Sequence, residues 1–327
     1  MVRLAEARGA RERVERVLAW TEAAIVEGAG GDVAAERALR SVVLPATRAA
    51  REVPEWPPVA LPLLVGDVLG LPADGAETVA AGCLLHFASA DVIDDAQDGH
   101  LDPAHWPTWQ GAVAGGLAAQ FLAQQVVMAS VPPGERAAAA AALGGAGLAM
   151  ALGQRLDLAQ HGPLGAVGGE EEYLACARSK TGASIALFAS LPAIAAGASL
   201  PTIVGLRGWG EAMGCALQLS SDVMDTLEPA SRDRGAGRIT LVVQRAWARL
   251  GSADRPLLEA AWRGEPEAPP LDFLLQRTGA LAYVRARIGA LRIEAREALA
   301  APGVAPGLSE ALLGWTERTG CWDTARV

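Results

Sequence analysis

Acidic side chains cluster at one point of the sequence, where Asp94-Asp95-Ala-Gln-Asp98 follows an apolar run. If this run is helical, Asp94 and Asp98 project from the same face, because residues four apart are neighbours on a helix. Two carboxylates on one face repel each other unless a cation joins them. Mg²⁺ suits such oxygen ligands, since it binds a few carboxylates together with waters and phosphate oxygens. The spacing indicates a magnesium site, and a solvated acidic helix end explains this motif equally well when it is taken alone.

A second polar stripe lies further along the chain. Gln218, Asp222 and Asp225 fall at positions i, i+4 and i+7, and Ser221 precedes Asp222, so that the first motif's spacing recurs with serine in its first position. Two helices with such stripes could hold a metal–diphosphate cluster between them. Taken alone, this stripe is more typical of a solvent-exposed helix face.

The elements that must position these residues are predicted to be helices. Half of the residues (51%) are apolar, mostly alanine and leucine, and good helix formers outnumber β-branched residues. Proline and glycine clusters divide the chain into segments of helical length, among them Ala76–Asp98, Ala137–Gln160, Glu170–Ala198 and Trp209–Leu227. No strand-like alternation of useful length is visible. We therefore predict an all-α fold in which residues 1–327 form a single helical domain.

Charge and cysteine usage exclude several classes of protein. The formal net charge of −9 argues against a nucleic-acid binder but permits an anionic substrate held through metal ions. The four cysteines are far apart and form no CxxC pair, so a zinc site or a disulfide framework is not expected; they are Cys83, Cys176, Cys215 and Cys321. The first residues mix arginine and glutamate and do not resemble a signal peptide. These features favour a protein of the reducing cytoplasm.

Two uncharged runs, Ala183–Leu206 and Gly111–Gly134, are long enough to cross a bilayer. The first contains Pro192 and Pro201 together with many small residues, and the second contains three glutamines. Membrane spans are usually richer in leucine, isoleucine and valine and have aromatic or basic anchors. We therefore expect buried core helices and no integral membrane span.

The order of the motifs resembles the trans-isoprenyl diphosphate synthases, which are the polyprenyl synthetase family of the isoprenoid synthase (class I terpenoid synthase) helical-bundle fold. The resemblance runs from about Ala76 to Leu241. It depends on five motifs in order: Asp94–Asp98 as the first aspartate-rich motif, Gly153–Asp157 as GQxxD, Glu171–Ala183 as "EEYL…KT", Gln218–Asp225 as the second aspartate-rich motif, and Asp233–Leu241 as the "D…GKxTL" loop with Arg238 in place of lysine.

The resemblance implies roles for individual residues. The leaving diphosphate needs fixed cations around it as its charge develops. The implied metal ligands for Mg²⁺ are Asp94, Asp98, Ser221, Asp222 and Asp225. The implied catalytic residues are Asp94, Asp95, Asp98, Lys180 and Asp222, and the implied prenyl diphosphate contacts are Lys180, Thr181, Gln218, Arg238, Ser89 and Ala90. It also implies a homodimer, or a heteromer with an active homologue.

The size of the residues before the first motif predicts the length of the hydrocarbon. In this fold the prenyl tail runs along the helix that ends in the first motif. Ser89 and Ala90 are small and should leave room for about twenty carbons or more.

Three departures from the family pattern concern the second substrate and one metal ligand. No arginine occurs in Gly99–His105, where the family has an arginine pair, and Glu55-Trp56-Pro57-Pro58 replaces a basic element. Ser221 stands where the family has an aspartate. The allylic half of the site is thus retained and the isopentenyl diphosphate half is not. Three functions remain open: a Mg-dependent prenyltransferase or polyprenyl diphosphate synthase, a class I terpene cyclase that uses one prenyl diphosphate, and a non-catalytic subunit of a heteromeric synthase.

Overall fold

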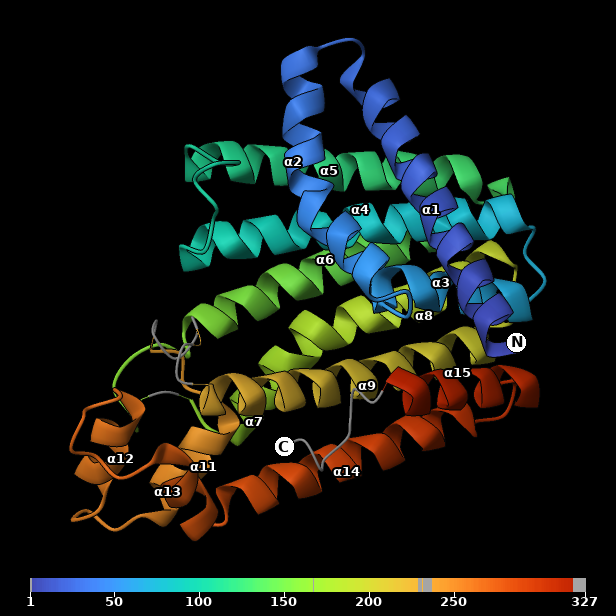
Figure 1. Ribbon diagram of the computed structural model, residues 1–327. Coiled ribbons are helices and arrows are strands. Elements are labelled where there is room, and N and C mark those ends of the chain that lie inside the picture. Colours follow the sequence, from blue (N-terminus) through green and yellow to red (C-terminus); the bar gives the residue numbers. More distant parts are fainter. Residues whose placement is uncertain (1, 167, 229–230, 232–236, 320–327) are drawn as a thin grey trace. The chain divides into compact units, whose positions relative to one another are not determined.

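The computed structural model describes residues 2–166, 168–228, 231 and 237–319 (Figure 1). The regular elements of these residues are helices, and an isolated antiparallel bridge joins His161 to Arg238. The helices are α1 (Val2–Ala29), α2 (Val33–Glu52), α3 (Pro57–Val68), α4 (Ala73–Asp98), α5 (Trp109–Ser130), η1 (Pro133–Glu135), α6 (Arg136–Leu158), α7 (Glu170–Ala177), η2 (Arg178–Gly182), α8 (Ala183–Ala195), α9 (Leu200–Leu227), α11 (Leu241–Arg249), α12 (Arg255–Trp262), α13 (Leu271–Arg277), α14 (Ala280–Leu299) and α15 (Pro306–Thr319). The predicted all-α architecture is confirmed.

The chain forms two compact units. The first unit contains residues up to Leu148, with Ser184–Gly210 and Leu299–Trp315; the second contains Ala149–Ala183, Glu211–Ala298 and the described residues from Thr316 onwards. The prediction of one domain for residues 1–327 stays a prediction.

The core of the first unit is built around α4. This helix packs along α5 and α3, and α1 and α2 pack across the α4–α5 pair (Figure 1). The core side chains are mostly alanine, valine and leucine from these five helices. Because alanine and glycine are small, the backbones can approach closely. A Cβ atom on Gly116 of α5 would lie 2.7 Å from a side-chain carbon of Ile93, and one on Gly82 of α4 would lie 2.4 Å from Val127.

The ends of α4 fix where its acidic residues lie. The helix begins directly after Pro72 and stops at Gly99, whose φ of 75° is in the left-handed region that glycine adopts without strain. The amide N–H of His100 then donates to the carbonyl of Asp95 at 2.8 Å. Asp94, Asp95 and Asp98 consequently occupy the last two turns of α4, as the sequence predicts.

One segment differs from the helix that the sequence predicts. The segment Glu170–Ala198 was expected to be one helix, but it consists of α7, the π-helical turn η2 and α8, which ends at Ala195. Single π-helical turns inside helices frequently mark functional sites. The turn contains Lys180 and Thr181, two of the residues expected to bind substrate.

By length and composition alone, α4, α5 and Pro133–Leu158 are apolar enough to cross a membrane. The predicted run Ala183–Leu206 is not one helix, because α8 ends at Ala195 and α9 begins at Leu200. All of α8 from Ser184 on is buried, as expected of a core helix. The second run corresponds to α5, which is only partly buried and exposes Leu117 and Phe121.

Three of the cysteines, Cys83, Cys176 and Cys215, are buried free thiols. Burial raises the pKa of the Cys215 thiol to about 11 and that of Cys176 to about 12, so both are protonated at neutral pH. Cys321 and Asp233, the first residue of the predicted "D…GKxTL" loop, lie outside the described residues.

Candidate functional site

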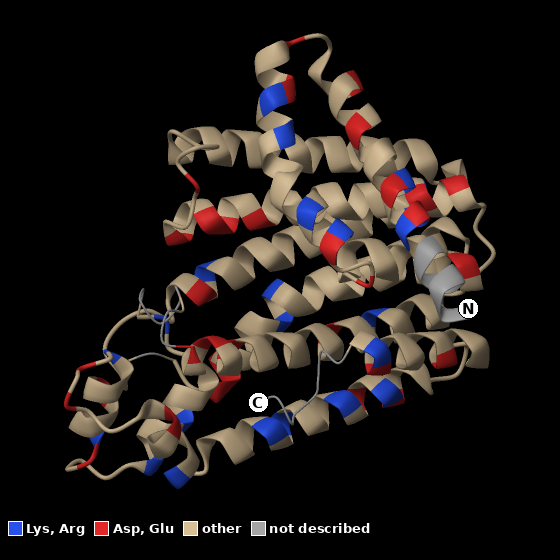
Figure 2. Ribbon diagram, viewed as in Figure 1, with Lys and Arg blue, Asp and Glu red and all other residues tan. Residues whose placement is uncertain are grey.

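The carboxyl-terminal turns of α4 form the first part of the candidate site. Figure 2 shows acidic residues gathered at this end of the helix. Asp94, Asp95 and Asp98 are all half-buried, so they are neither fully hydrated nor packed away from a ligand. The sequence prediction that these residues share one helix end is confirmed.

This arrangement places several negative charges close together at the end of a helix. The carboxyl end of a helix is the negative end of its dipole, where acidic side chains destabilise and cations stabilise. The last turn of α4 has no basic residue of its own. Oxygen ligands of this kind and this local negative charge fit a hard divalent ion such as Mg²⁺.

The residues before the acidic motif are small and closely packed. The Ser89 hydroxyl is buried and donates a 2.7 Å hydrogen bond to the carbonyl of Gly116 on α5, while Ala90 is half-buried. One turn earlier, burial lowers the pKa of His86 to about 4, although the side chain of Gln120 opposes this shift. His86 is therefore a neutral core residue at pH 7.

The second unit contains a cluster in which one carboxylate contacts two cations. The Nζ atom of Lys180 lies 2.6 Å from one oxygen of Asp157, and a terminal nitrogen of Arg238 lies 2.7 Å from the other. The Asp157 side chain is only 3% exposed, against 20% for Lys180 and 12% for Arg238. Lys180 and Arg238, the two residues predicted to donate to the diphosphate, thus both contact the buried carboxylate of Asp157.

Three glycines allow the backbones to meet around η2. A Cβ atom on Gly153 of α6 would lie 2.8 Å from the backbone nitrogen of Lys180, and one on Gly214 of α9 would lie 2.5 Å from the carbonyl oxygen of Thr181. A Cβ atom on Gly182 would lie 2.9 Å from the carbonyl oxygen of Glu211. Any larger residue at these positions would push a neighbouring backbone away from Lys180 and Thr181. The π-helical turn is therefore enclosed by close backbone contacts.

Asp222 is the centre of a buried hydrogen-bond network. One carboxylate oxygen accepts from the Tyr173 hydroxyl and the other accepts from Nε2 of Gln218 at 2.7 Å, while Thr181 donates in turn to the Gln218 side chain. Arg238 approaches Asp222 at 4.0 Å. Burial raises the pKa of Asp222 despite the opposing effects of Arg238, Tyr173 and Gln218. Protein donors therefore contact both oxygens of Asp222, and a metal ion could bind only through a remaining lone pair of one of them.

Ser221 and Asp225 lie on the more exposed side of the same stripe. The Ser221 hydroxyl donates to a carboxylate oxygen of Asp225 at 3.2 Å, and Ser221 is solvent-exposed. A hydroxyl and a carboxylate one turn apart can both act as oxygen ligands. The structure thus divides the predicted second motif into a buried member, Asp222, and two accessible members.

Two residues of the second unit's network received no individual role from the sequence. Asp157 belongs to the GQxxD motif and Tyr173 to the "EEYL" motif, but the sequence indicated no role for either side chain. Membership of these motifs was the one indication in the sequence that the two residues matter. The contacts of Asp157 could not be predicted from it, because Asp157, Lys180 and Arg238 lie in three segments that are far apart in the chain.

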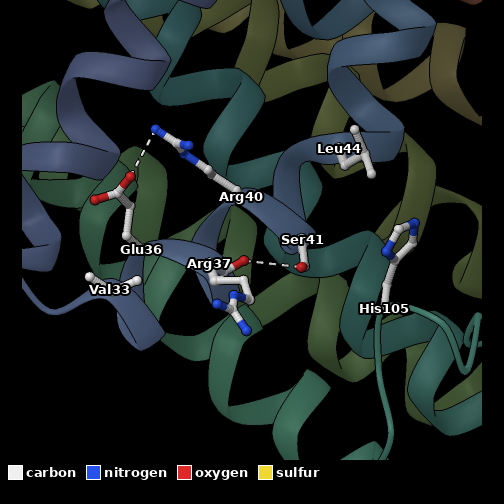
Figure 3. A pocket seen from close by; sticks show the side chains of 7 residues that line it. All are labelled: Val33, Glu36, Arg37, Arg40, Ser41, Leu44 and His105. Atoms are coloured by element: carbon white, nitrogen blue, oxygen red, sulfur yellow. Dashed lines mark hydrogen bonds and ion pairs between the residues drawn. The ribbon is translucent and has the colours of Figure 1, made fainter.

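A hollow of about 360 Å³ on α2 is lined by two arginines, Arg37 and Arg40. Figure 3 shows the lining side chains, among them Arg37 and His105, with the ion pair between Arg40 and Glu36 at 2.8 Å. Arg40 also pairs with Glu22 of α1. These carboxylates offset the positive charge of Arg40, so the hollow does not supply a strongly cationic diphosphate site.

Comparison with known proteins places these observations in a family. The family model for polyprenyl synthetases matches residues 84–269, which is more than half of the chain. A short chain isoprenyl diphosphate synthase of Methanothermobacter thermautotrophicus is 29% identical over 266 residues, which cover 71% of this chain and 78% of the relative.

Solved structures show the same fold. The geranylgeranyl pyrophosphate synthetase of Pyrococcus horikoshii superposes with a TM-score of 0.76 at 19% identity, covering 97% of this chain and 99% of that chain. The geranylgeranyl pyrophosphate synthase of Corynebacterium glutamicum, solved in complex with isoprenyl diphosphate and magnesium, gives a TM-score of 0.76 at 18% identity and covers 95% and 97%. The predicted isoprenoid synthase fold is confirmed.

Proposed function

Since this chain belongs to the polyprenyl synthetase family, we propose that it is a Mg²⁺-dependent prenyltransferase that binds and ionises an allylic prenyl diphosphate. The observation that carries the proposal is the acidic end of α4, where half-buried carboxylates meet the negative end of the helix dipole with no basic residue in the last turn. The magnesium and isoprenyl diphosphate in the Corynebacterium glutamicum structure support the same ligand chemistry.

The roles of the residues follow from their chemistry. Asp94 and Asp98 of α4 offer oxygen ligands for Mg²⁺, with Asp95 next to Asp94 in the chain, and Ser221, Asp222 and Asp225 of α9 offer oxygen ligands as well. Bound Mg²⁺ would supply positive charge to the diphosphate as its bond to the allylic carbon breaks. Lys180 and Arg238 donate to the diphosphate oxygens, and Thr181 and Gln218 hold the neighbouring backbone and side chains in place.

The prenyl chain accepted is long. Ser89 and Ala90 are the small residues that precede the first acidic residue, and the Ser89 side chain is held against α5. A chain of about twenty carbons or more can then lie along α4 without meeting a bulky side chain. The name of the Pyrococcus horikoshii neighbour, a geranylgeranyl pyrophosphate synthetase, agrees with a substrate or product of this size.

A class I terpene cyclase is the second candidate function. The observation that favours it is the weak provision for a second diphosphate: Arg51 is paired with Glu15, and Arg40 with Glu22 and Glu36. A cyclase ionises one diphosphate and needs no second anion site. The third candidate, a non-catalytic subunit, would need an active homologue as partner.

The protein acts as a homodimer in the cytoplasm, with no integral membrane span. Helix α5 exposes Trp109, Leu117 and Phe121 at intervals of four or eight residues, which gives one apolar stripe. An exposed apolar stripe of this kind is typical of an interface. A second copy is the occupant proposed here, and a heteromer with an active homologue is the alternative; sedimentation of the purified protein distinguishes a monomer from a dimer.

Product analysis distinguishes the three candidate functions. Purified protein and Mg²⁺ are incubated with allylic diphosphates of ten to twenty carbons, with and without isopentenyl diphosphate, and the products are identified by mass spectrometry. A longer prenyl diphosphate supports chain elongation. A hydrocarbon or alcohol formed without isopentenyl diphosphate supports the cyclase, and activity that appears only after mixing with a homologue supports the subunit. Absence of allylic diphosphate binding under all conditions contradicts the proposal.

A further inference from the structure

We propose that Asp157 is a positioning residue, whose carboxylate holds Lys180 and Arg238 side by side so that both cations meet one diphosphate. This inference rests on the proposed function, because it assigns Lys180 and Arg238 to that ligand. Its direct support is the pair of contacts at 2.6 Å and 2.7 Å, one on each oxygen of the same buried side chain.

The backbone around Asp157 fixes its position relative to Lys180. Gly153, one turn earlier on α6, has no side chain and lies directly against the backbone of η2, where a Cβ atom would be 3.0 Å or less from Ser179 and Lys180. The Cys176 thiol donates to the Gly153 carbonyl at 3.4 Å. The end of α6 and the π-helical turn are therefore attached to each other beside the ion pair.

Arg238 is attached, through residues that follow it in the chain, to the turn that directly follows α6. The amide N–H of Ile239 donates to the carbonyl of Gln160 at 3.0 Å, and Nε2 of Gln244 donates to the Gln160 side chain at 3.0 Å. Gln160 follows Asp157 by three residues. Asp157 thus lies where two separately anchored segments bring their cations together.

The charges explain why a carboxylate is needed at this point. Two neighbouring cations with little solvent around them repel each other strongly, because the local dielectric constant is low. One carboxylate between them offsets this repulsion and sets the distance between them. An ammonium group has three N–H donors and a guanidinium five, so a single contact with Asp157 does not use their whole capacity.

Replacement of Asp157 by asparagine separates this role from packing. Asparagine keeps the shape of the side chain but has one acceptor oxygen, and its amide nitrogen is a donor. It can accept from Lys180 or from Arg238 but would present N–H groups to the other cation. Asp157→Asn should therefore displace one of the two cations while the backbone contacts around Gly153 and Gln160 remain.

The experiment measures ligand affinity and steady-state kinetics. The affinity for an allylic thiolodiphosphate, which does not ionise readily, is measured by calorimetry with Mg²⁺ for the wild type and for Asp157→Asn. We expect a loss of affinity of about 10- to 100-fold, as for one charge-assisted hydrogen bond, and an increase in KM for the allylic substrate that exceeds the change in kcat. The matched control is Glu294→Gln. It removes an ion pair of similar length, at 2.8 Å, from Arg178 in the same π-helical turn, and should leave affinity unchanged.

A double-mutant cycle tests whether Asp157 acts through the cations. If it does, Asp157→Asn should cost no further affinity in a Lys180→Gln/Arg238→Gln background. Equal losses in both backgrounds, or a wild-type affinity in Asp157→Asn, overturn the inference. An additive loss accompanied by a higher Mg²⁺ requirement would instead identify Asp157 as a metal ligand and also overturns it.

Two further measurements separate the possible failures. If the wild type binds no allylic diphosphate, the proposed function itself fails; if it binds and the cycle is additive, only the role of Asp157 fails. Circular dichroism establishes whether Asp157→Asn is folded. Should it unfold, the cycle is repeated with Asp157→Glu, which keeps the charge but displaces it by one methylene; the affinity loss should again vanish in the Lys180→Gln/Arg238→Gln background, and an additive loss overturns the inference.

Discussion

The Tyr173 hydroxyl donates a hydrogen bond to a carboxylate oxygen of Asp222, and both side chains are buried. A buried carboxylate oxygen that loses its donor costs about 1–3 kcal/mol of stability. Tyr173→Phe should therefore lower the free energy of unfolding by that amount, measured by chemical denaturation. It should also raise KM for the allylic diphosphate, because Asp222 lies near Arg238.

Tyr283→Phe is the matched control for this prediction. Tyr283 is the second of the chain's two tyrosines and also donates to a carboxylate, that of Glu170, but it is only partly buried. Its loss should change stability less and leave KM unaltered. Equal effects of the two variants on KM would contradict a specific role for the Tyr173–Asp222 contact.

Removal of one acidic group at the end of α4 should abolish turnover without loss of the fold. Asp94→Asn takes away a proposed Mg²⁺ ligand and should lower kcat by at least about a hundredfold. The melting temperature should stay the same or rise, since repulsion among the carboxylates at the negative end of the helix dipole decreases. Asp74→Asn, at the opposite end of the same helix, is the control and should keep full activity. Unchanged turnover in Asp94→Asn would refute the acidic site.

The length of the product should respond to the size of residue 90. Ala90→Phe adds a bulky side chain one turn before Asp94, and a close-packed interior accommodates added volume poorly. We expect shorter products than the chains of about twenty carbons or more predicted for the wild type, measured by mass spectrometry. Ala73→Phe, at an exposed position at the start of the same helix, should leave the product length unchanged. A wild-type preference for ten-carbon substrates or products would contradict the depth of the pocket.

Isopentenyl diphosphate should bind weakly, while an allylic diphosphate binds clearly in the presence of Mg²⁺. Arg48 and Arg51 lie on α2, and Arg51 forms an exposed ion pair with Glu15 at 2.9 Å, which raises the pKa of Arg51 and keeps it paired with Glu15. The double variant Arg48→Ala/Arg51→Ala should therefore change isopentenyl diphosphate affinity by less than about threefold in calorimetry. If the wild type binds isopentenyl diphosphate tightly and the double variant does not, these arginines form the second substrate site, and ordinary chain elongation becomes the better interpretation.

The buried imidazole of His86 should make the protein less stable in acid. Its pKa is lowered to about 4 from the usual 6.5 by burial, so the unfolded chain binds a proton between these values and the folded chain does not. The free energy of unfolding therefore falls as the pH is lowered from about 6.5 to about 4, by at most about 1.4 kcal/mol per pH unit. His86→Leu should reduce this slope in urea titrations, whereas His105→Leu, at an exposed loop position, should keep it. The same slope in both variants would exclude His86 as its source.

The sequence by itself determined the helical class and the two acidic motifs. Alanine-rich segments bounded by proline and glycine have few alternatives to helices, and residues four apart share a helix face. The sequence alone therefore places Asp94 and Asp98 together. The end of α4 was equally predictable, because Gly99 adopts the left-handed conformation that stops a helix.

Only the tertiary structure determined which residues contact one another in the cluster around Asp157. Asp157, Lys180 and Arg238 are separated by 23 or more residues, and only packing brings them into contact. The π-helical turn likewise depends on Gly153, Gly182 and Gly214 allowing distant backbones to touch. Helix geometry is short-range, so local spacing in the sequence specifies which residues share a helix face. The contacts between carboxylates and cations depend on long-range packing, which cannot be read from the order of the residues.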